Sequence, residues 1–214
     1  NAAVEFNEPV AFFSLEMTSM ELLDRLIATE SGISSDKLKG KLKLLPEEWQ
    51  VLEQSVGRIV KAPIYIDETP GITLTEFVAK SKRLVREKGV KIIFVDYLQL
   101  MHSGKPQLGG FSKVQEVTEI SNTLKTTAKE LNIPIIALAQ LNRNLMSRMG
   151  SNGKPVLSDL KDSGSIEQDA DIVVFLHRPG LIGLAEDPDE QAKAEVIFAK
   201  NRNGQVGSVE MRYV

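Results

Sequence analysis

Residues 91–101, KIIFVDYLQLM, restrict the fold of this chain more than any other segment. Four consecutive apolar residues at 92–95 are too continuous for a strand with one wet face. They favour a parallel strand covered by helices on both sides. The run ends at Asp96. Because ligands of open α/β sheets bind at the carboxyl ends of the strands, this carboxylate would lie where a metal–phosphate complex binds. Asp96 taken alone could equally cap the following turn.

The composition indicates one ordinary globular domain. The chain has 214 residues, of which 42% are hydrophobic and 26% charged, so it is long enough to bury a core without disulfides. No apolar run approaches the roughly 18–20 residues of a membrane helix, and no signal-peptide pattern opens the chain. The absence of cysteine excludes disulfides and thiolate metal sites and agrees with a cytoplasmic protein. We interpret His102 and His177 as ordinary loop or strand-end residues and expect no zinc site.

The net charge of −3 means that any nucleic-acid binding would need locally concentrated basic groups. One such segment is residues 141–161, which contains Arg143, Arg148, Lys154 and Lys161 against a single acid, Asp159. A solvated loop with chance charges is the simpler interpretation of this segment by itself.

Strands and helices alternate along the chain. The apolar runs predict strands at residues 10–15, 64–66, 91–96, 133–139, 172–176, 194–200 and 207–213. Helical periodicity and Thr–x–x–Glu capping boxes predict helices at residues 18–31, within 33–62, and at 73–88 and 114–131, and residues 1–6 resemble the end of a helix. Trp49 is expected to anchor the 33–62 segment in the core. The Asn203–Gly204 pair predicts a hairpin turn. We therefore expect an α/β fold: a mostly parallel sheet flanked by helices, with a C-terminal β-hairpin.

Three of the apolar strands end on polar residues whose chemistries complement one another: Glu16, Asp96 and Gln140. One carboxylate can take a proton from water, a second can hold Mg²⁺ through its water shell, and an amide can contact a phosphate oxygen. This combination suits nucleoside triphosphate hydrolysis, in which catalysis is mostly positioning and charge stabilisation.

Lys200 and Arg202 lie at the end of a strand, where it enters the hairpin. Side chains at i and i+2 of a strand point to the same face, so the two cations can reach one polyanion together. The alternative interpretation is an edge strand whose charges prevent aggregation.

A phosphate-binding loop of the form G-x-x-x-x-G-K-[ST] is missing from these residues. The three Gly–Lys pairs, at Gly40, Gly104 and Gly153, are followed by Leu, Pro and Pro. The chain as written therefore lacks the main phosphate contact of such a domain.

Six segments together resemble the bacterial replicative DNA helicase of the DnaB family, in the family's order. They are FFSLEM (12–17), DETPG (67–71), VDYLQLM (95–101), IIALAQLNR (135–143), SGSIEQDADIVVFLHR (163–178) and AKNRNGQVG (199–207). The resemblance implies that residues 1–214 are a RecA-like motor domain with a P-loop NTPase core. The family's N-terminal helical domain and the phosphate loop would precede residue 1. We thus expect a chain truncated just after that loop, or one interrupted by a self-splicing element.

The resemblance implies an ATP-dependent DNA helicase that translocates on single-stranded DNA as a homohexameric ring, with ATP and Mg²⁺ as cofactors. Glu16 would activate the attacking water, Asp96 would hold Mg²⁺ through water, and Gln140 would couple the γ-phosphate to the DNA loops. Arg25 would lie near the nucleotide. Lys200 and Arg202 would act in trans on a neighbour's ATP.

The resemblance also implies that the loops at 102–113 and 141–164 face the central channel. Arg143 and the turn formed by Lys161, Asp162, Ser163 and Gly164 would contact DNA, although Lys161 stands where the family has arginine, which loses bidentate geometry. A primase and a helicase loader are the expected protein partners. The expected location is the bacterial cytoplasm, in association with the nucleoid, without a membrane.

Two other functions are compatible with the sequence. Without a phosphate loop the chain could be a non-catalytic DNA-binding or oligomerisation module. A RecA-type recombinase ATPase has the same fold, but the EQDAD segment (167–171) and the Lys–x–Arg hairpin disfavour it.

Overall fold

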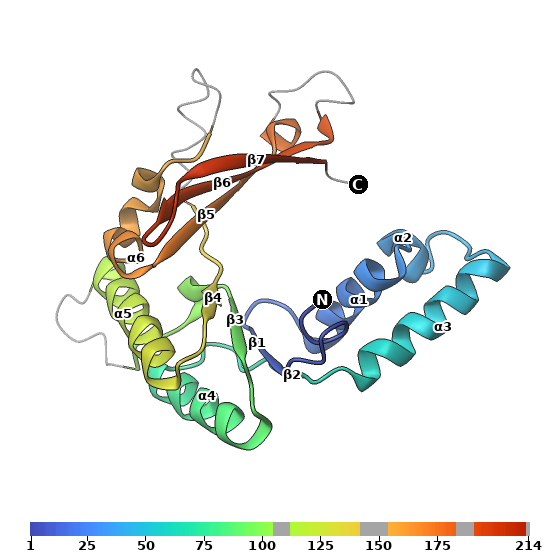
Figure 1. Cartoon of the computed structure of the whole chain (residues 1–214), viewed down its shortest axis with the longest axis horizontal. Coiled ribbons are helices and arrows are strands. Elements are labelled where there is room, and N and C mark those ends of the chain that lie inside the picture. The colour runs from blue at the N-terminus through green and yellow to red at the C-terminus, as the bar shows by residue number, and fades with distance from the viewer. Residues whose placement is uncertain (105–111, 142–153, 183–190, 213–214) are drawn as a thin grey trace. The chain divides into compact units, whose positions relative to one another are not determined.

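The computed structural model describes residues 1–104, 112–141, 154–182 and 191–212 (Figure 1). The chain divides into two compact units. The first comprises Asn1–Lys105 and Thr126–Ala139, and the second comprises Pro106–Lys125 and Gln140–Val214. No helix in the described segments is both long and apolar enough to cross a membrane.

The first unit is built on a parallel sheet of four strands in the order β2-β1-β3-β4 (Figure 1). The strands are β1 (Val10–Ser14), β2 (Ile64–Asp67), β3 (Ile92–Asp96) and β4 (Ile135–Ala137). Ser14 of β1 pairs with Asp96 of β3, and Val95 of β3 pairs with Ala137 of β4. Because all four strands run in one direction, their carboxyl ends lie along a single edge of the sheet.

The core of this unit lies on the two central strands, as their apolar sequences predict. Ala11 and Phe13 of β1 and Ile93 and Val95 of β3 are completely buried. The ring of Phe13 packs against that of Phe77 with centroids 4.8 Å apart, which attaches α4 (Leu74–Lys88) to the sheet. The strand β4 is an edge strand of its sheet, so alternate side chains stay exposed although its sequence is apolar.

The helices of the first unit begin and end where the sequence predicts. α1 (Ser19–Ser31) begins at a capping box of Thr18 and Glu21, and α4 begins at the equivalent box of Thr73 and Glu76. α1 and α4 end at glycines with a left-handed backbone, at φ of 70° and 66°. The remaining elements of this unit are α2 (Ser35–Leu38), α3 (Pro46–Lys61), the short 3₁₀ helix η1 (Leu98–Leu100), and the end of α5 (Lys113–Leu131), which spans both units.

Two predictions for this unit are wrong. Residues 1–6 form a turn with one helix-like bond, from the Glu5 amide to the Asn1 carbonyl at 2.8 Å, and no helix. Trp49 is 59% exposed and does not anchor the core. The buried residues of α3 are Ser55 and Ile59, both in its second half. Trp49, in the first turn of the helix, therefore lies outside the packed region.

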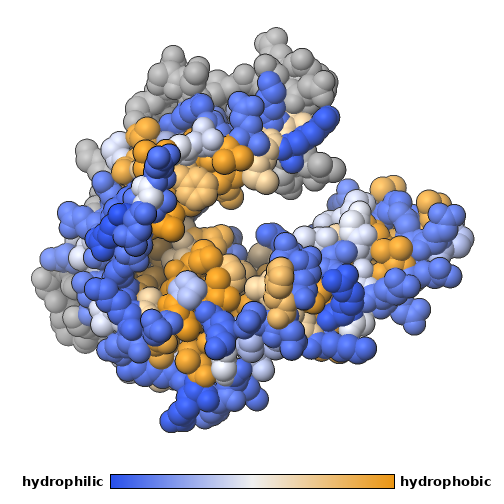
Figure 2. Space-filling model, in the orientation of Figure 1, coloured by the Kyte–Doolittle hydropathy of each residue, from blue (hydrophilic) through white to orange (hydrophobic). Residues whose placement is uncertain are grey.

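The second unit contains an antiparallel sheet of three strands in the order β5-β6-β7 (Figure 1). The strands are β5 (Ile172–His177), β6 (Lys193–Asn201) and β7 (Gly207–Arg212), accompanied by η3 (Leu157–Ser163), α6 (Gly164–Asp169) and η4 (Pro179–Ile182). Exposed and buried residues alternate strictly along β5. One face of the sheet is therefore open in the described structure, and hydrophobic surface is visible where this sheet lies (Figure 2).

The hairpin between β6 and β7 is present, but its turn is longer than the Asn203–Gly204 pair predicts. The two strands are joined by residues 202–206. The Asn201 side chain shapes this loop, because its oxygen accepts from the Asn203 amide and its nitrogen donates to the Gln205 carbonyl, each at 3.3 Å. Since β6 is the central strand of this sheet, the alternative interpretation of Lys200 as a charge on an edge strand is wrong.

Candidate functional site

Glu16 lies immediately beyond β1, in the turn between that strand and α1. The turn is fixed by Ser14, a buried residue whose hydroxyl donates to the Met17 carbonyl at 2.7 Å. The Leu15 amide donates to the Asp96 carbonyl at 2.8 Å, which joins the ends of β1 and β3. The Glu16 side chain itself is exposed. The backbone of this turn is therefore held rigidly while the carboxylate remains open to a ligand.

Asp96 is the last residue of β3 and is half-buried. Beyond it the chain stays attached to β4, because Leu138 donates to the Val95 carbonyl at 2.9 Å and accepts from the Leu98 amide at 3.0 Å. The strands that precede Glu16, Asp96 and Gln140 are thus neighbours in one sheet, as the sequence predicts. Gln140 belongs to the second unit, where its side chain is exposed.

Asp96 is the residue of this edge that could hold a hydrated metal ion. Within the described residues, no group of three or more acids or histidines could hold a metal ion. Mg²⁺ usually keeps several waters and binds through one or two carboxylates together with substrate phosphates. A single half-buried acid at a strand end, as at Asp96, fits that mode of binding.

Glu68 also lies at this edge of the sheet, although the sequence alone did not indicate a role for it. It follows β2, and its carboxylate accepts from the Ser19 amide at the start of α1 at 2.5 Å. This backbone hydrogen bond lowers the pKa of Glu68. Since α1 starts three residues after Glu16, Glu68 helps to fix the turn that carries Glu16. The available signal was the pair of acids, Asp67 and Glu68, that follows the predicted strand at 64–66, as Asp96 follows the apolar run at 92–95.

Arg25 is an exposed residue of α1 in the first unit. It lines a cavity of about 280 Å³ between α1 and α2, together with Met17, Glu21, Asp24 and Lys39 among others. Met17 directly follows Glu16, so this cavity opens beside the turn that carries the exposed carboxylate. Its lining carries both signs of charge and is suited to a polar ligand.

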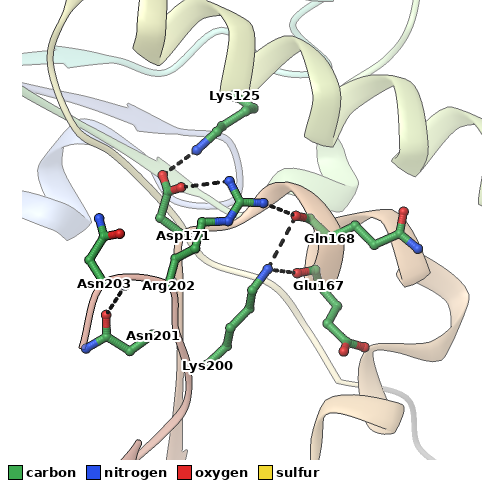
Figure 3. Close-up of polar contacts among 8 residues, drawn as sticks. All are labelled: Lys125, Glu167, Gln168, Asp171, Lys200, Asn201, Arg202 and Asn203. Carbon is green, nitrogen blue, oxygen red and sulfur yellow. Dashed lines mark hydrogen bonds and ion pairs between the residues drawn. The ribbon is translucent and has the colours of Figure 1, made fainter. Parts of the chain in front are cut away.

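Lys200 and Arg202 converge on the same end of α6 in the second unit (Figure 3). The Lys200 ammonium donates to the carbonyls of Glu167 and Gln168, the latter at 3.3 Å. The Arg202 guanidinium also donates to the Gln168 carbonyl, at 3.1 Å. The last carbonyls of a helix have no partner within the helix, so they attract donors of this kind. The structure therefore brings the two cations together, as the i, i+2 spacing predicts.

Asp171 completes this cluster (Figure 3). One of its carboxylate oxygens pairs with the Lys125 ammonium of α5, and the other lies 3.3 Å from the Arg202 guanidinium. The Arg202 amide also donates to the Asp171 carbonyl at 2.8 Å. The roles of Lys125 and Asp171 were not apparent from the sequence, because their contacts join segments that are distant in the chain.

The residues expected to contact DNA are only partly within the described structure. Arg143 lies outside the described residues, as do large parts of both proposed channel loops. Residues 161–164 span the junction of η3 and α6. Lys154, within the second of these loops, forms an ion pair with Glu195 of β6 at 2.7 Å.

Comparison with known proteins identifies the family. A family model described as "DnaB-like helicase C terminal domain" matches residues 1–214. "Replicative DNA helicase DnaB" of Geobacillus stearothermophilus is 43% identical over 215 residues, covering 100% of this chain and 46% of that protein. "Replicative DNA helicase DnaC" of Bacillus subtilis (strain 168) is 42% identical with the same coverage. The chain spans about half the length of the curated relatives it matches.

Solved structures agree on the fold. "ATPase Domain of G40P" matches with a TM-score of 0.88 and 34% identity, covering 99% of this chain and 73% of that one. "The Structure Of A DnaB-Like Replicative Helicase And Its Interactions With Primase" matches with a TM-score of 0.86 and 34% identity, covering 99% and 49%. From its first residue to its last, this chain belongs to the DnaB-like helicase C-terminal domain family.

Proposed function

We propose that this domain is the ATP-hydrolysing motor of a replicative DNA helicase. The observation that carries the proposal is the placement of Glu16 and Asp96 at the carboxyl ends of two adjacent parallel strands, with Ser14 and Asp96 in register. Two carboxylates at neighbouring strand ends can share the work of hydrolysis. Glu16, which is exposed, would take the proton of the attacking water, and Asp96 would hold Mg²⁺ through its water shell, where the ion would neutralise phosphate charge. The relatives are named replicative DNA helicases, and this is the basis for proposing that the hydrolysis drives DNA unwinding.

The other residues take supporting roles in this proposal. Gln140 contacts the γ-phosphate and couples the presence of this phosphate to the adjoining DNA-binding loop. Arg25 binds the nucleotide from α1. Lys200 and Arg202 act on the ATP of a neighbouring subunit in a hexameric ring, where a cation supplied in trans can accelerate phosphoryl transfer by about 10³–10⁵. The cofactors are ATP and Mg²⁺.

Single-stranded DNA is the proposed track, bound in the ring by its phosphates. Arg143 and the turn formed by Lys161, Asp162, Ser163 and Gly164 provide the contacts. Such backbone binding is independent of sequence and weakens with salt. A primase and a loader are proposed partners; one structural relative is described together with its interactions with primase. The bacterial cytoplasm, on the nucleoid, is the proposed location.

The test is the Glu16→Gln substitution in the complete protein, with ATP hydrolysis measured in the presence of single-stranded DNA. We expect hydrolysis to fall by at least about 10²-fold, because the variant loses its general base. Binding of a fluorescent ATP analogue should remain within about twofold of the original, since glutamine keeps the side-chain shape.

Glu53→Gln is the matched control, because Glu53 is an exposed glutamate of α3 outside the site. This variant should hydrolyse ATP at the original rate. Normal hydrolysis by Glu16→Gln would contradict the assignment of the base.

A second candidate is a non-catalytic DNA-binding or oligomerisation module. These 214 residues contain no G-x-x-x-x-G-K-[ST] motif, which another part of the complete protein would have to supply for hydrolysis. The two candidates differ in the complete protein, which should hydrolyse ATP only if it is the motor. The 214 residues alone should hydrolyse little ATP in either case. Robust DNA-stimulated hydrolysis by the isolated 214-residue chain would show that the missing motif is dispensable.

A further inference from the structure

Asp171 occupies the short connection between α6 and β5 and touches two cations from different elements. Its two carboxylate oxygens face Lys125 of α5 and Arg202, which follows β6 (Figure 3). All three residues belong to the second unit. The ion pairs join Asp171 to residues 46 and 31 positions away in the sequence.

The sheet register sets this contact. Ile172 pairs with Asn201 in the antiparallel ladder of β5 and β6, so Asp171 and Arg202 face each other one position further on. The Arg202 amide donates to the Asp171 carbonyl there at 2.8 Å. An opposite-charge pair placed directly across two antiparallel strands is favourable. Arg202 is thus held against Asp171 both by a backbone hydrogen bond and by a side-chain ion pair.

The contact fixes Arg202 without covering it. One terminal nitrogen of the guanidinium donates to Asp171 at 3.3 Å and the other to the Gln168 carbonyl at 3.1 Å. A guanidinium has five N–H donors, and the Arg202 side chain remains 52% exposed. The group is therefore held along one side while the rest stays accessible to an anion. Lys200 differs, because its contacts are to backbone carbonyls.

Such a pair contributes little to the stability of the fold. The side chains of Asp171 and Arg202 are each more than half exposed, and exposed ion pairs stabilise proteins only weakly. What the pair supplies is orientation: a long flexible side chain that is ordered in advance has less conformational entropy to lose when it meets a phosphate.

We propose that Asp171 is a positioning residue that presents Arg202 to the nucleotide of a neighbouring subunit, and that Lys125 holds Asp171 in place. The proposal rests on the function proposed above, in which Arg202 acts in trans. Asp171 does not touch the nucleotide. It acts through Arg202, and its loss affects the neighbour's site and not the site of its own subunit.

The experiment uses Asp171→Asn in the complete protein, with DNA-stimulated ATP hydrolysis and a thermal melt as readouts. We expect kcat to fall on the order of 10- to 100-fold, because displacement of a catalytic group by about 1 Å can cost that much. KM for ATP should stay within about twofold. Asp171→Glu keeps the charge and should recover part of the lost rate. Asp169→Asn changes an acid of α6 outside this cluster and should behave as the original protein.

Mixed oligomers separate positioning from a structural role. When Asp171→Asn is co-expressed with Glu16→Gln, activity should rise above that of either variant alone. The Glu16→Gln subunits offer an intact Arg202 to neighbours that retain their base. Co-expression with Arg202→Ala should give no such rise, since both variants are defective in the same donated group.

The outcomes are distinct. Hydrolysis by Asp171→Asn at the original rate would overturn the inference and leave the proposed function intact. Low activity that Glu16→Gln subunits do not restore would also overturn it. If Asp171→Asn melts at a much lower temperature than Asp169→Asn, the same comparisons are made with Asp171→Glu. A complete protein without any ATP hydrolysis would overturn the proposed function, and this inference with it.

Discussion

His177 is the last residue of β5, as the sequence indicated, and it is buried on the same face of the strand as Val173 and Phe175. It pairs across the ladder with Glu195, which in turn binds Lys154. Burial lowers the pKa of His177, and the Lys154 charge lowers it further, while the Glu195 carboxylate opposes the shift. The folded protein therefore keeps this imidazole neutral at a pH where an unfolded chain would protonate it.

The lowered pKa of His177 predicts a stability that depends on pH. Its pKa in the fold lies below the ordinary value near 6.5, so the unfolded state binds more protons in the window just below pH 6.5. The contribution of the neutral His177 to the free energy of unfolding should be complete above that window. The free energy of unfolding should decrease as the pH falls through the window. Urea denaturation between pH 5 and 8 measures this, above the range in which the carboxylates titrate.

The His177→Asn variant should show a weaker dependence on pH in the same window. The identical change at the exposed His102 is the matched control. Equal pH dependence in the original protein and in His177→Asn would count against the role of His177.

At the scale of elements, the helix ends are specified by short local motifs. In α4 the Thr73 hydroxyl accepts from the Glu76 amide at 3.3 Å, and the Glu76 carboxylate accepts from the Thr73 amide at 3.0 Å. These bonds satisfy amide groups that have no partner within the helix. The Thr73 amide and the Thr73 hydroxyl both donate to the Glu76 carboxylate, and these two hydrogen bonds lower the pKa of Glu76.

Removing the cap of α4 should destabilise the first unit. We expect Thr73→Ala to lower the free energy of unfolding by about 1 kcal/mol, because one helical amide loses its acceptor. Thr75→Ala replaces an exposed threonine two residues later, within the helix, and alanine is the better helix former. That control should be neutral or slightly stabilising. The prediction fails if the two variants have the same denaturation midpoint.

At the scale of the whole molecule, the contacts divide the chain into two units, each with its own sheet. The first unit is organised around Phe13 and Phe77, both fully buried. In the second, Val173 and Phe175 of β5 are buried on one face of the sheet. Separate cores imply that local stability is set within each unit.

Truncation of one core should therefore loosen mainly its own unit. Phe77→Ala removes a fully buried ring, which typically costs about 3–5 kcal/mol, and should reduce hydrogen-exchange protection in β1, β3 and α4. Phe175→Ala is the counterpart in the second unit and should reduce protection in β5 and β6. Equal loss of protection over both units after either change would show that the chain unfolds as one cooperative body.

The sequence by itself determined the features that depend on neighbouring residues. The capping boxes at Thr18 and Thr73 join residues three positions apart, and the glycines that end α1 and α4 act through their own backbone. Apolar runs that end on Glu16 and Asp96 likewise identified the polar edge of the parallel sheet. Such local preferences depend only on residues close together in the sequence, so they can be predicted before the tertiary structure is known.

The tertiary structure alone decided which distant groups meet. Glu68 reaches Ser19 across 49 residues, and Asp171 reaches Lys125 across 46. The exposure of Trp49 and the edge position of β4 also depend on what packs against them. A hydrogen bond or a buried face between remote segments requires the complete fold to bring them together. No short sequence pattern encodes such a long-range contact, because the contact can stabilise the protein only after the chain between the two residues has been ordered.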